Sequence, residues 1–170
     1  MSEVTLRKLS DGDLPRVIEI LSFWNMAPIA PTAAVPVPET TGLEPDRTTL
    51  ATMRQKIVGV ASYILLKNAW AETTSLAVDP AWLGHGIGEK LQIARLKEMK
   101  MIGIQNVKTE CDRPEVINWY VRKFGYRIVG TSPKKHDFCR HDVDHWTVLN
   151  LDLRDWQPRE VFVTSSSAKG

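Results

Sequence analysis

The sequence predicts a mixed α/β fold, in which one central sheet of about seven strands carries helices on both faces. Two observations indicate this class. Seven short apolar segments have the length and residue types of strands, and three longer segments show helical periodicity. Some consecutive strands are separated by short turns and others by a helix, so the chain combines hairpins with crossover units.

The chain has the size of one domain. Its 170 residues, of which 43% are hydrophobic, can build one well-packed core and are too few for two. We expect a single domain over residues 1–153. A C-terminal tail, residues 154–170, is expected to be partly disordered because it ends in small polar residues.

The first two elements precede a proline-rich stretch. Residues 4–9 are predicted to form a strand, and Asp11 or Asp13 can cap the helix that follows. The apolar face of that helix comprises Leu14, Val17, Ile18 and Leu21. Residues 23–47 contain five prolines, which argues against a continuous helix, and a loop of this length is usually a binding loop or a flexible segment.

Three strands are predicted in the middle of the chain, at residues 50–53, 57–66 and 72–78. The turn at Gln55-Lys56 between the first two is very short, so we expect imperfect pairing there. The third strand leads into a glycine-containing turn and then into a helix over residues 86–101, with Gly103 as its C-terminal cap.

The last part of the chain alternates strands and one helix. Residues 107–111 form a predicted strand, and Pro114 opens a helix that ends near Phe124. Two final strands, at residues 126–131 and 146–153, flank a polar loop. The resulting order, β-α-loop-β-β-β-α-β-α-β-β, predicts a mixed sheet.

Three glycines at alternate positions, Gly84, Gly86 and Gly88, connect the third central strand to its helix. Glycine permits positive φ and close approach of a ligand, and the first-turn N–H groups of a helix attract an anion. A diphosphate is therefore a candidate ligand. Two known glycine motifs are not matched. The phosphate loop of ATPases has Lys-Ser/Thr directly after its last glycine, whereas Glu89 and Lys90 follow Gly88. The dinucleotide fingerprint is G-x-G-x-x-G, and here the last glycine comes one residue too early.

This strand, turn and helix resemble the coenzyme A-binding segment of the GNAT superfamily of acyl-CoA-dependent N-acyltransferases. The family pattern is Arg/Gln-x-x-Gly-x-Gly/Ala; Gly86 and Gly88 match its glycines, and Leu83 replaces its Arg or Gln. The element order over residues 4–153 is also that of the family. The resemblance implies a mostly antiparallel mixed sheet, and acetyl-CoA as the acyl donor with no metal.

The resemblance also implies which residues contact the coenzyme. The turn and its flanks comprise Leu76, Ala77, Val78, Leu83, Gly84, His85, Gly86, Ile87, Gly88 and Glu89. Basic side chains that could meet the 3′-phosphate are Lys90, Arg95, Arg122 and Lys123. Main-chain N–H groups are expected to supply most contacts, so the replacement at Leu83 matters little.

For the general base, the resemblance indicates Glu72, because a glutamate at this point of the strand accepts the proton of the amine in several members. The alternative is a strand-end residue that faces solvent. Glu110 and Asp112, at the end of the next strand, are substitutes near the place where the family's acceptor enters. A carboxylate accepts an ammonium proton efficiently only if burial raises its pKa.

For the general acid, Tyr120 fits the spacing N-x-x-A-x-x-x-Y of the family, with Arg113 and Val116 at the positions of its Asn and Ala. In the family three residues separate this tyrosine from a Gly-Phe pair, whereas here four residues separate Tyr120 from Gly125-Tyr126. If the extra residue lay before Tyr120 in the alignment, Val121 would occupy the position of the general acid instead. The alternative for Tyr120 is an amphipathic core residue with its hydroxyl at the rim.

The implied function is transfer of an acetyl group to a primary amine by direct attack. Trp24, Met26, Glu110 and Asp112 are expected to contact the acceptor, which is a small-molecule amine with an apolar part or a peptide N-terminus. A non-catalytic module that binds acyl-CoA remains the alternative.

Cys111 could accept the acyl group covalently, although a lone cysteine at a strand end is usually a small buried residue.

The polar loop near residues 134–146 allows a further reading. It contains four possible metal ligands, His136, Cys139, His141 and His145, but their spacing matches no standard zinc pattern. The loop could instead line the acceptor pocket, where Lys135 or Arg140 would bind an acidic group of the acceptor.

Charge and composition exclude other classes of protein. The net charge is +2, and Lys and Arg are scattered, which argues against a nucleic-acid binder. No apolar run is long enough to span a bilayer, and residues 1–7 lack a signal-peptide core, so no membrane association is expected. Two cysteines do not make a disulfide framework, so a cytoplasmic protein is expected. A homodimer is left open.

Overall fold

A computed structural model describes residues 3–28 and 43–158 of the chain. Seven strands form one sheet in the order β1-β2-β3-β4-β5-β7-β6, and only the pair β4–β5 is parallel. The strands are β1 (Thr5–Lys8), β2 (Thr48–Met53), β3 (Lys56–Leu65), β4 (Trp70–Val78), β5 (Asn106–Cys111), β6 (Arg127–Pro133) and β7 (His145–Asp152). The predicted fold class, a mixed and mostly antiparallel sheet of seven strands, is confirmed.

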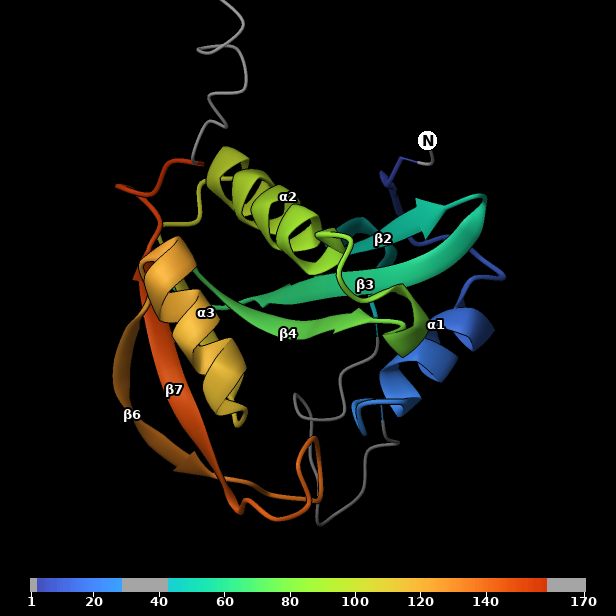
Figure 1. The fold of residues 1–170 in the computed structure, drawn as a ribbon. Helices are drawn as coiled ribbons and strands as arrows, with labels where there is room; N and C mark the ends of the chain where they lie inside the picture. Colours follow the sequence, from blue (N-terminus) through green and yellow to red (C-terminus); the bar gives the residue numbers. More distant parts are fainter. Residues whose placement is uncertain (1–2, 29–42, 159–170) are drawn as a thin grey trace, which may run out of the picture.

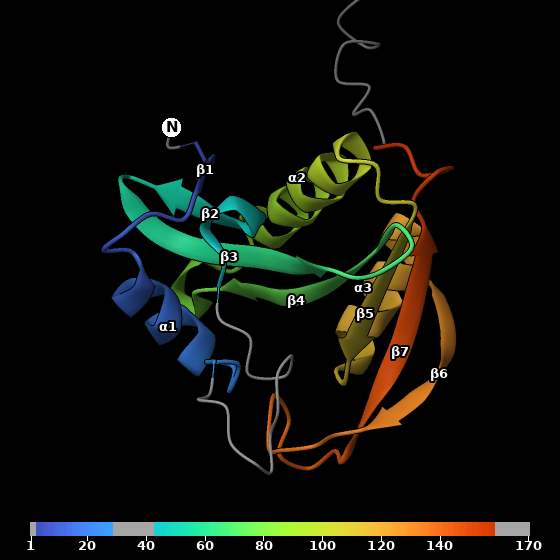
Figure 2. The ribbon, with the colours of Figure 1, turned by 180° about the vertical axis from the view of Figure 1, so that it is seen from behind.

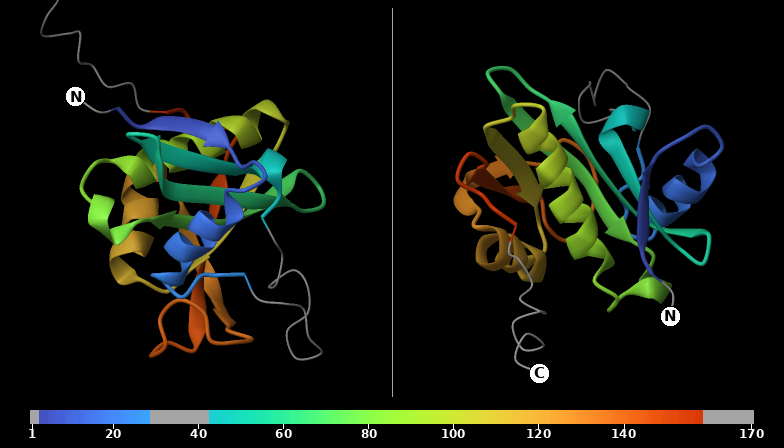
Figure 3. Two further views of the ribbon diagram at one scale, coloured as in Figure 1. Left: turned by 90° about the vertical axis from the view of Figure 1, so that its right-hand side faces the viewer. Right: turned by 90° about the horizontal axis from the view of Figure 1, so that it is seen from above.

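Helices cover both faces of the sheet, as predicted (Figures 1 and 3). They are α1 (Leu14–Ser22), α2 (Ile87–Met101) and α3 (Pro114–Phe124), with two short 3-10 helices, η1 (Pro45–Arg47) and η2 (Pro80–Trp82). No helix in the described part of the chain is long and apolar enough to cross a membrane.

The side chains of β2 and β3 alternate between the two faces of the sheet, and this alternation decides which residues pack against which helix. Leu50 and Val60 pack against α1, whereas their neighbours Ala51 and Ala61 pack against α2. Successive strand residues point to opposite faces, so β2 and β3 are buried on both sides. The third cluster joins α3 to the end of α2 and to β5 and β7, and it includes Trp156, which lies beyond the predicted domain limit.

Two irregularities interrupt the antiparallel ladders. The β2–β3 hairpin turns through Arg54 and Gln55, both with positive φ, and its register shifts between Ala51 and Thr52, in line with the imperfect pairing expected there. In the β3–β4 pair, Ser62 lies opposite Ser75 but Tyr63 lies opposite Thr73. Thr74 is therefore an extra residue in β4, and such a bulge bends the strand.

Part of the proline-rich stretch and most of the predicted tail, residues 29–42 and 159–170, lie outside the described residues. Trp24 and Met26, the two candidates from the start of that stretch, are described and half-buried.

Candidate functional site

The parallel strands β4 and β5 separate in the middle of the sheet. Among the described residues, their pairing runs from Trp70 and Asn106 to Thr73 and Thr109 and then stops. The hydroxyls of Thr73 and Thr109 are hydrogen-bonded to each other at this last pair. Beyond it, β5 stays paired with β7 while β4 turns away (Figure 2). The result is a V-shaped opening with its apex at Thr73 and Thr109.

The edge of β4 that faces this opening carries main-chain groups. Asp79 N donates to Val58 O of β3 at 2.8 Å, so the carbonyl of the preceding residue, Val78, points to the opposite edge. Trp24 Nε1 donates to this carbonyl at 2.9 Å. The guanidinium of Arg113, at the start of α3, lies 5.1 Å from the centroid of the Trp24 ring. Trp24 thus lies between the end of β4 and the start of α3.

The glycine turn follows β4 directly. Asp79 Oδ1 accepts a hydrogen bond from Ala81 N at 2.9 Å and starts η2, after which Gly84 and Gly86 both have positive φ, 87° and 72°. Such values favour glycine because a Cβ would be strained there. Gly86 is the N-cap of α2 and offers no side-chain cap, so the first N–H groups of the helix have no side-chain partner there. The turn from Leu83 to Gly86 is exposed.

An ion pair ties this turn to α3. Lys123 Nζ lies 2.9 Å from Glu89 Oε2, so the first turn of α2 is close to the last turn of α3. Glu89 is thereby partly neutralised, which limits its repulsion of an anion at the N-terminus of α2.

A cavity of about 380 Å³ lies beside the V-shaped opening. Its walls come from β4, β5, the start of β7, the loop between β6 and β7, and the segment that follows α1. Met26 and Glu110, two of the residues expected to contact the acceptor, line it together with Glu72, the expected base, whereas Trp24 does not. Lys108 lies between the two acids: its Nζ is 3.9 Å from Glu72 Oε1 and 4.0 Å from Glu110 Oε1.

The loop between β6 and β7 closes one side of this cavity. Cys139 N donates to Asn25 O at 2.9 Å, and Asn25 Nδ2 donates back to Cys139 O at 3.2 Å. Phe138 and Cys139 line the cavity beside Met26. The segment after α1 and the loop, which are more than a hundred residues apart in sequence, are therefore held together over the cavity.

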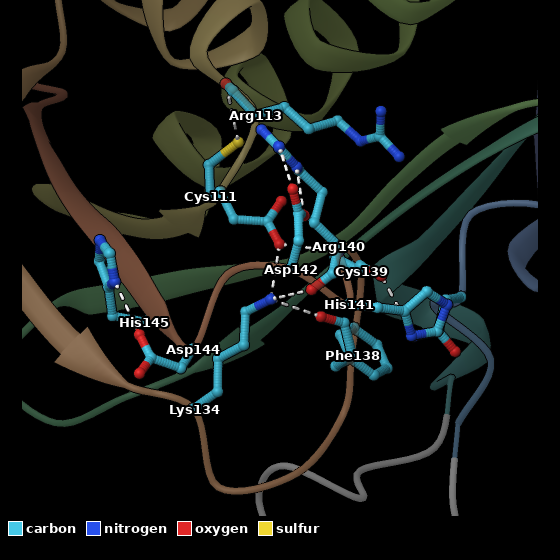
Figure 4. A network of polar contacts seen from close by, with 12 residues as sticks. Cys111, Arg113, Lys134, Phe138, Cys139, Arg140, His141, Asp142, Asp144 and His145 are labelled. Carbon is cyan, nitrogen blue, oxygen red and sulfur yellow. Dashed lines mark hydrogen bonds and ion pairs between the residues drawn. The ribbon is translucent and has the colours of Figure 1, made fainter.

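Asp112 lies outside the cavity lining, in contrast to its predicted role in acceptor binding. Its side chain is buried, and its Oδ2 accepts hydrogen bonds from Lys134 Nζ at 2.7 Å and from Arg140 N at 2.9 Å. Lys134 Nζ also donates to the carbonyls of Phe138 and Arg140, both at 2.8 Å (Figure 4). Asp112 therefore anchors the loop that forms the cavity wall.

Tyr120 is buried between α3 and the sheet, on the helix side of the V-shaped opening, and it does not line the cavity. Burial raises the pKa of its hydroxyl, while Arg95 and Thr109 act on that pKa in the opposite direction. Thr109 is the apex residue of β5, so the hydroxyl lies close to the apex. At neutral pH this tyrosine is protonated and can only donate its proton.

Arg95 is buried, with only 2% of its surface exposed. It is therefore neither a solvated surface charge nor a contact for the 3′-phosphate, the two alternatives that the sequence left open for it. Its guanidinium donates to Ser62 O at 3.0 Å, to Ser75 O at 2.7 Å and to Gln92 Oε1. It therefore supports β3 and β4 beside the bulge. The spacing Leu91-Arg95-Met99 along the buried face of α2 is the sequence signal that indicates this burial.

The histidine-rich loop does not assemble a metal site within the described residues, where no three His, Cys, Asp or Glu side chains come together. His141 Nδ1 contacts Asp137, and His145 Nδ1 contacts Asp144.

Burial raises the pKa of the Cys111 thiol, which disfavours the thiolate that covalent acyl transfer requires.

A family model described as an acetyltransferase (GNAT) domain matches residues 44–128, which is half of the chain. The chain belongs to the GNAT acetyltransferase family. The matched region begins just before η1 and ends in β6, and it includes the glycine turn, the V-shaped opening, Glu72 and Tyr120. The protein is accordingly an acyltransferase. No curated protein matches the chain in sequence.

Solved structures of N-acetyltransferases share the fold. The ribosomal-protein-S18-alanine N-acetyltransferase of Escherichia coli is 19% identical, with a TM-score of 0.67 over 89% of this chain and 94% of that chain. Ard1 of Thermoplasma volcanium is 20% identical, with a TM-score of 0.70 over 88% and 97%. N-acetylglutamate synthase of Neisseria gonorrhoeae, solved with coenzyme A and L-arginine, is 16% identical, with a TM-score of 0.66 over 89% of this chain and 34% of that chain.

Proposed function

We propose that this protein transfers an acetyl group from acetyl-CoA to a primary amine by direct attack. One observation carries the proposal: the V-shaped opening between β4 and β5 adjoins the exposed glycine turn and a cavity that contains two carboxylates. A thioester donor needs an anion site, space for its extended arm and an adjacent place for an amine; the glycine turn, the V-shaped opening and the cavity would serve these three needs.

The coenzyme would be held mainly by main-chain groups. The first N–H groups of α2, at Ile87, Gly88 and Glu89, would bind its diphosphate, aided by the positive end of the helix dipole. The main-chain groups of Leu76 and the N–H of Val78, whose carbonyl already accepts from Trp24, would bind the extended arm of the coenzyme as a neighbouring strand does. The thioester would then lie near Thr73 and Thr109.

The acceptor amine would occupy the cavity, with Glu72 as the general base and Glu110 as its alternative. Both carboxylates are half-buried in the cavity wall, where they can bind an ammonium group and accept its proton. Tyr120 would give its proton to the departing thiolate. Holding the amine and the thioester together supplies much of the rate. A small amine is favoured over a peptide N-terminus, because the cavity has the volume of a small-molecule site and the Asn25–Cys139 contact closes one side.

A thiol-release assay with acetyl-CoA and a panel of amines tests the proposal. We expect release with at least one small primary amine, and binding of acetyl-CoA in calorimetry. Binding without release for any amine or peptide would indicate the non-catalytic alternative. Neither binding nor release by folded protein would refute the proposal.

The variant Gly88→Asp separates the coenzyme site from the fold, since the family pattern already allows alanine at this position. A Cβ at Gly88 would meet only Val78 Cγ2, at 3.9 Å, and an acidic residue in the first turn of a helix interacts favourably with the helix dipole. The melting temperature should therefore stay equal or rise. If the diphosphate approaches this turn, the added carboxylate should repel it and raise KM for acetyl-CoA roughly tenfold or more, corresponding to about 1.4 kcal/mol. Gly130→Asp, where a Cβ would meet no atom within 4 Å, is the matched control and should leave KM unchanged.

The catalytic roles are tested by two further variants. Tyr120→Phe should lower kcat more than it changes KM for acetyl-CoA, because the hydroxyl would act on the leaving thiolate. Glu72→Gln should suppress activity at neutral pH and recover part of it at high pH, where the amine is already deprotonated. Unchanged kcat in the first variant, or a pH profile like that of the wild type in the second, would remove that residue from its role.

A further inference from the structure

Lys108 is a primary amine inside the acceptor cavity itself. Its side chain comes from β5, lines the cavity and is 35% exposed. In the strand register it lies opposite Glu72, one residue before the Thr73–Thr109 apex of the V-shaped opening. The proposed function puts the thioester at that apex, so Lys108 presents an amine next to the position of the acetyl donor.

The surroundings of Lys108 Nζ meet the chemical requirements of an acceptor. Glu72 Oε1 lies at 3.9 Å and Glu110 Oε1 at 4.0 Å, and their side chains are 19% and 23% exposed. An ammonium group must lose a proton before it attacks a carbonyl, and a nearby carboxylate can accept that proton directly or through one water. The group proposed as the base for the substrate therefore also serves Lys108.

We propose that Lys108 is an acetyl acceptor of this protein when no amine substrate fills the cavity. The inference rests on the proposed function, since the same site supplies the donor and the base. The neutral amine of Lys108 attacks the thioester carbonyl carbon, a C–N bond forms and the C–S bond breaks. Of the two protons that the ammonium group loses, one passes to Glu72 and then to solvent, and the other passes to the departing thiolate, so no other reactant is needed.

Acetylation would change what the cavity binds. The ammonium of Lys108 neutralises one of the two carboxylates beside it, and the acetylated nitrogen carries no charge. The negative charges of Glu72 and Glu110 would then attract a cationic acceptor more strongly. The acetylated protein should favour diamines over monoamines more strongly than the unmodified protein does.

Incubation of the folded protein with acetyl-CoA, without any amine, tests this inference. Intact mass should rise by one acetyl group, and peptide mapping should place the group on Lys108. The first-order rate constant should not depend on protein concentration, because the transfer is intramolecular. An amine that supports thiol release should slow the labelling.

Matched lysines distinguish this reaction from chemical acetylation. Lys135 also lines the cavity, on the opposite loop wall, whereas Lys67, in the turn between β3 and β4, is exposed and does not line it. Lys108→Arg should abolish the fast labelling, whereas Lys135→Arg should retain it, and Glu72→Gln should slow it roughly tenfold or more, corresponding to about 1.4 kcal/mol. Labelling of Lys108 no faster than that of Lys67, or equally fast in heat-unfolded protein, would overturn the inference.

The two proposals fail in different ways. Thiol release with an added amine but no acetyl group on Lys108 would refute the inference and leave the proposed function standing. Absence of acetyl-CoA binding by folded protein would refute the proposed function and this inference with it.

Discussion

Replacement of Asp112 by asparagine tests whether this residue holds the cavity wall or binds the acceptor. The carboxylate pairs with Lys134 at 2.7 Å, and the side chains of the two residues are 2% and 5% exposed. Asn would keep the shape of the side chain but remove its charge. Lys134 would then remain a buried cation over the Trp146 ring, 4.6 Å from its centroid, without its anionic partner.

The expected loss of stability is large. Breaking a buried ion pair by removal of one partner costs about 3–5 kcal/mol, because the other charge stays buried without compensation. For a chain of this size, about 2–4 °C of melting temperature corresponds to 1 kcal/mol, so the melting temperature should fall by roughly 6–20 °C. Thermal unfolding followed by circular dichroism measures this shift.

Two comparisons test whether the unpaired charge of Lys134 causes the loss of stability in Asp112→Asn. The double variant Asp112→Asn with Lys134→Met should be less destabilised than the sum of the two single variants, because it leaves no buried charge. Asp142→Asn, which alters an exposed ion pair with Arg140 beside the same loop, should leave the melting temperature unchanged. A fall of less than about 1 kcal/mol for Asp112→Asn would refute the reasoning, and a rise in KM for the amine without loss of stability would restore the predicted role in acceptor binding.

Two further predictions concern packing and acidity. In Gly59→Ala the new Cβ would lie 2.9 Å from Leu91 Cδ1, 3.0 Å from Ile87 Cγ2 and 3.3 Å from a main-chain oxygen, so the side chains of α2 that pack there must move. We expect a loss of about 1–3 kcal/mol in unfolding experiments, against no change in Gly130→Ala. The hydrogen bonds from Arg7 and from Ser10 N hold the pKa of Asp13 well below its usual range. This carboxylate therefore stabilises the fold above about pH 4, and its contribution is lost as the pH falls towards the lower, folded-state pKa. The difference in melting temperature between wild type and Asp13→Ala should be largest above about pH 5 and should shrink in acid; a constant difference would contradict this assignment.

Sequence patterns predicted the elements and the glycine turn because these depend on neighbouring residues. Hydrophobic periodicity located all seven strands and the three helices, with bounds that differ by a few residues from those observed. The alternate glycines indicated a turn with positive φ, which Gly84 and Gly86 have. The sequence analysis expected Trp24, Met26, Glu110 and Asp112 at the acceptor and Glu72 as the base. Met26, Glu110 and Glu72 line the cavity, whereas Trp24 and Asp112 do not.

The burial of charged residues depended on partners far away in the chain. Arg95 resembles a surface cation in the sequence, but carbonyl groups of β3 and β4 accept its hydrogen bonds. Asp112 is likewise buried because Lys134 folds back onto it. Spacing places Arg95 on the buried face of α2, but neither spacing nor composition identifies the groups that compensate a buried charge, and these groups decide its energy.

The sequence by itself determined the order of elements, the family and the glycine turn, since each is encoded in local patterns of neighbouring residues. Only the tertiary structure decided where β4 leaves β5, how Thr74 bulges out of its strand, and that Lys108 lies between Glu72 and Glu110. These features depend on the pairing of separate strands, whose register is settled by packing across the whole sheet.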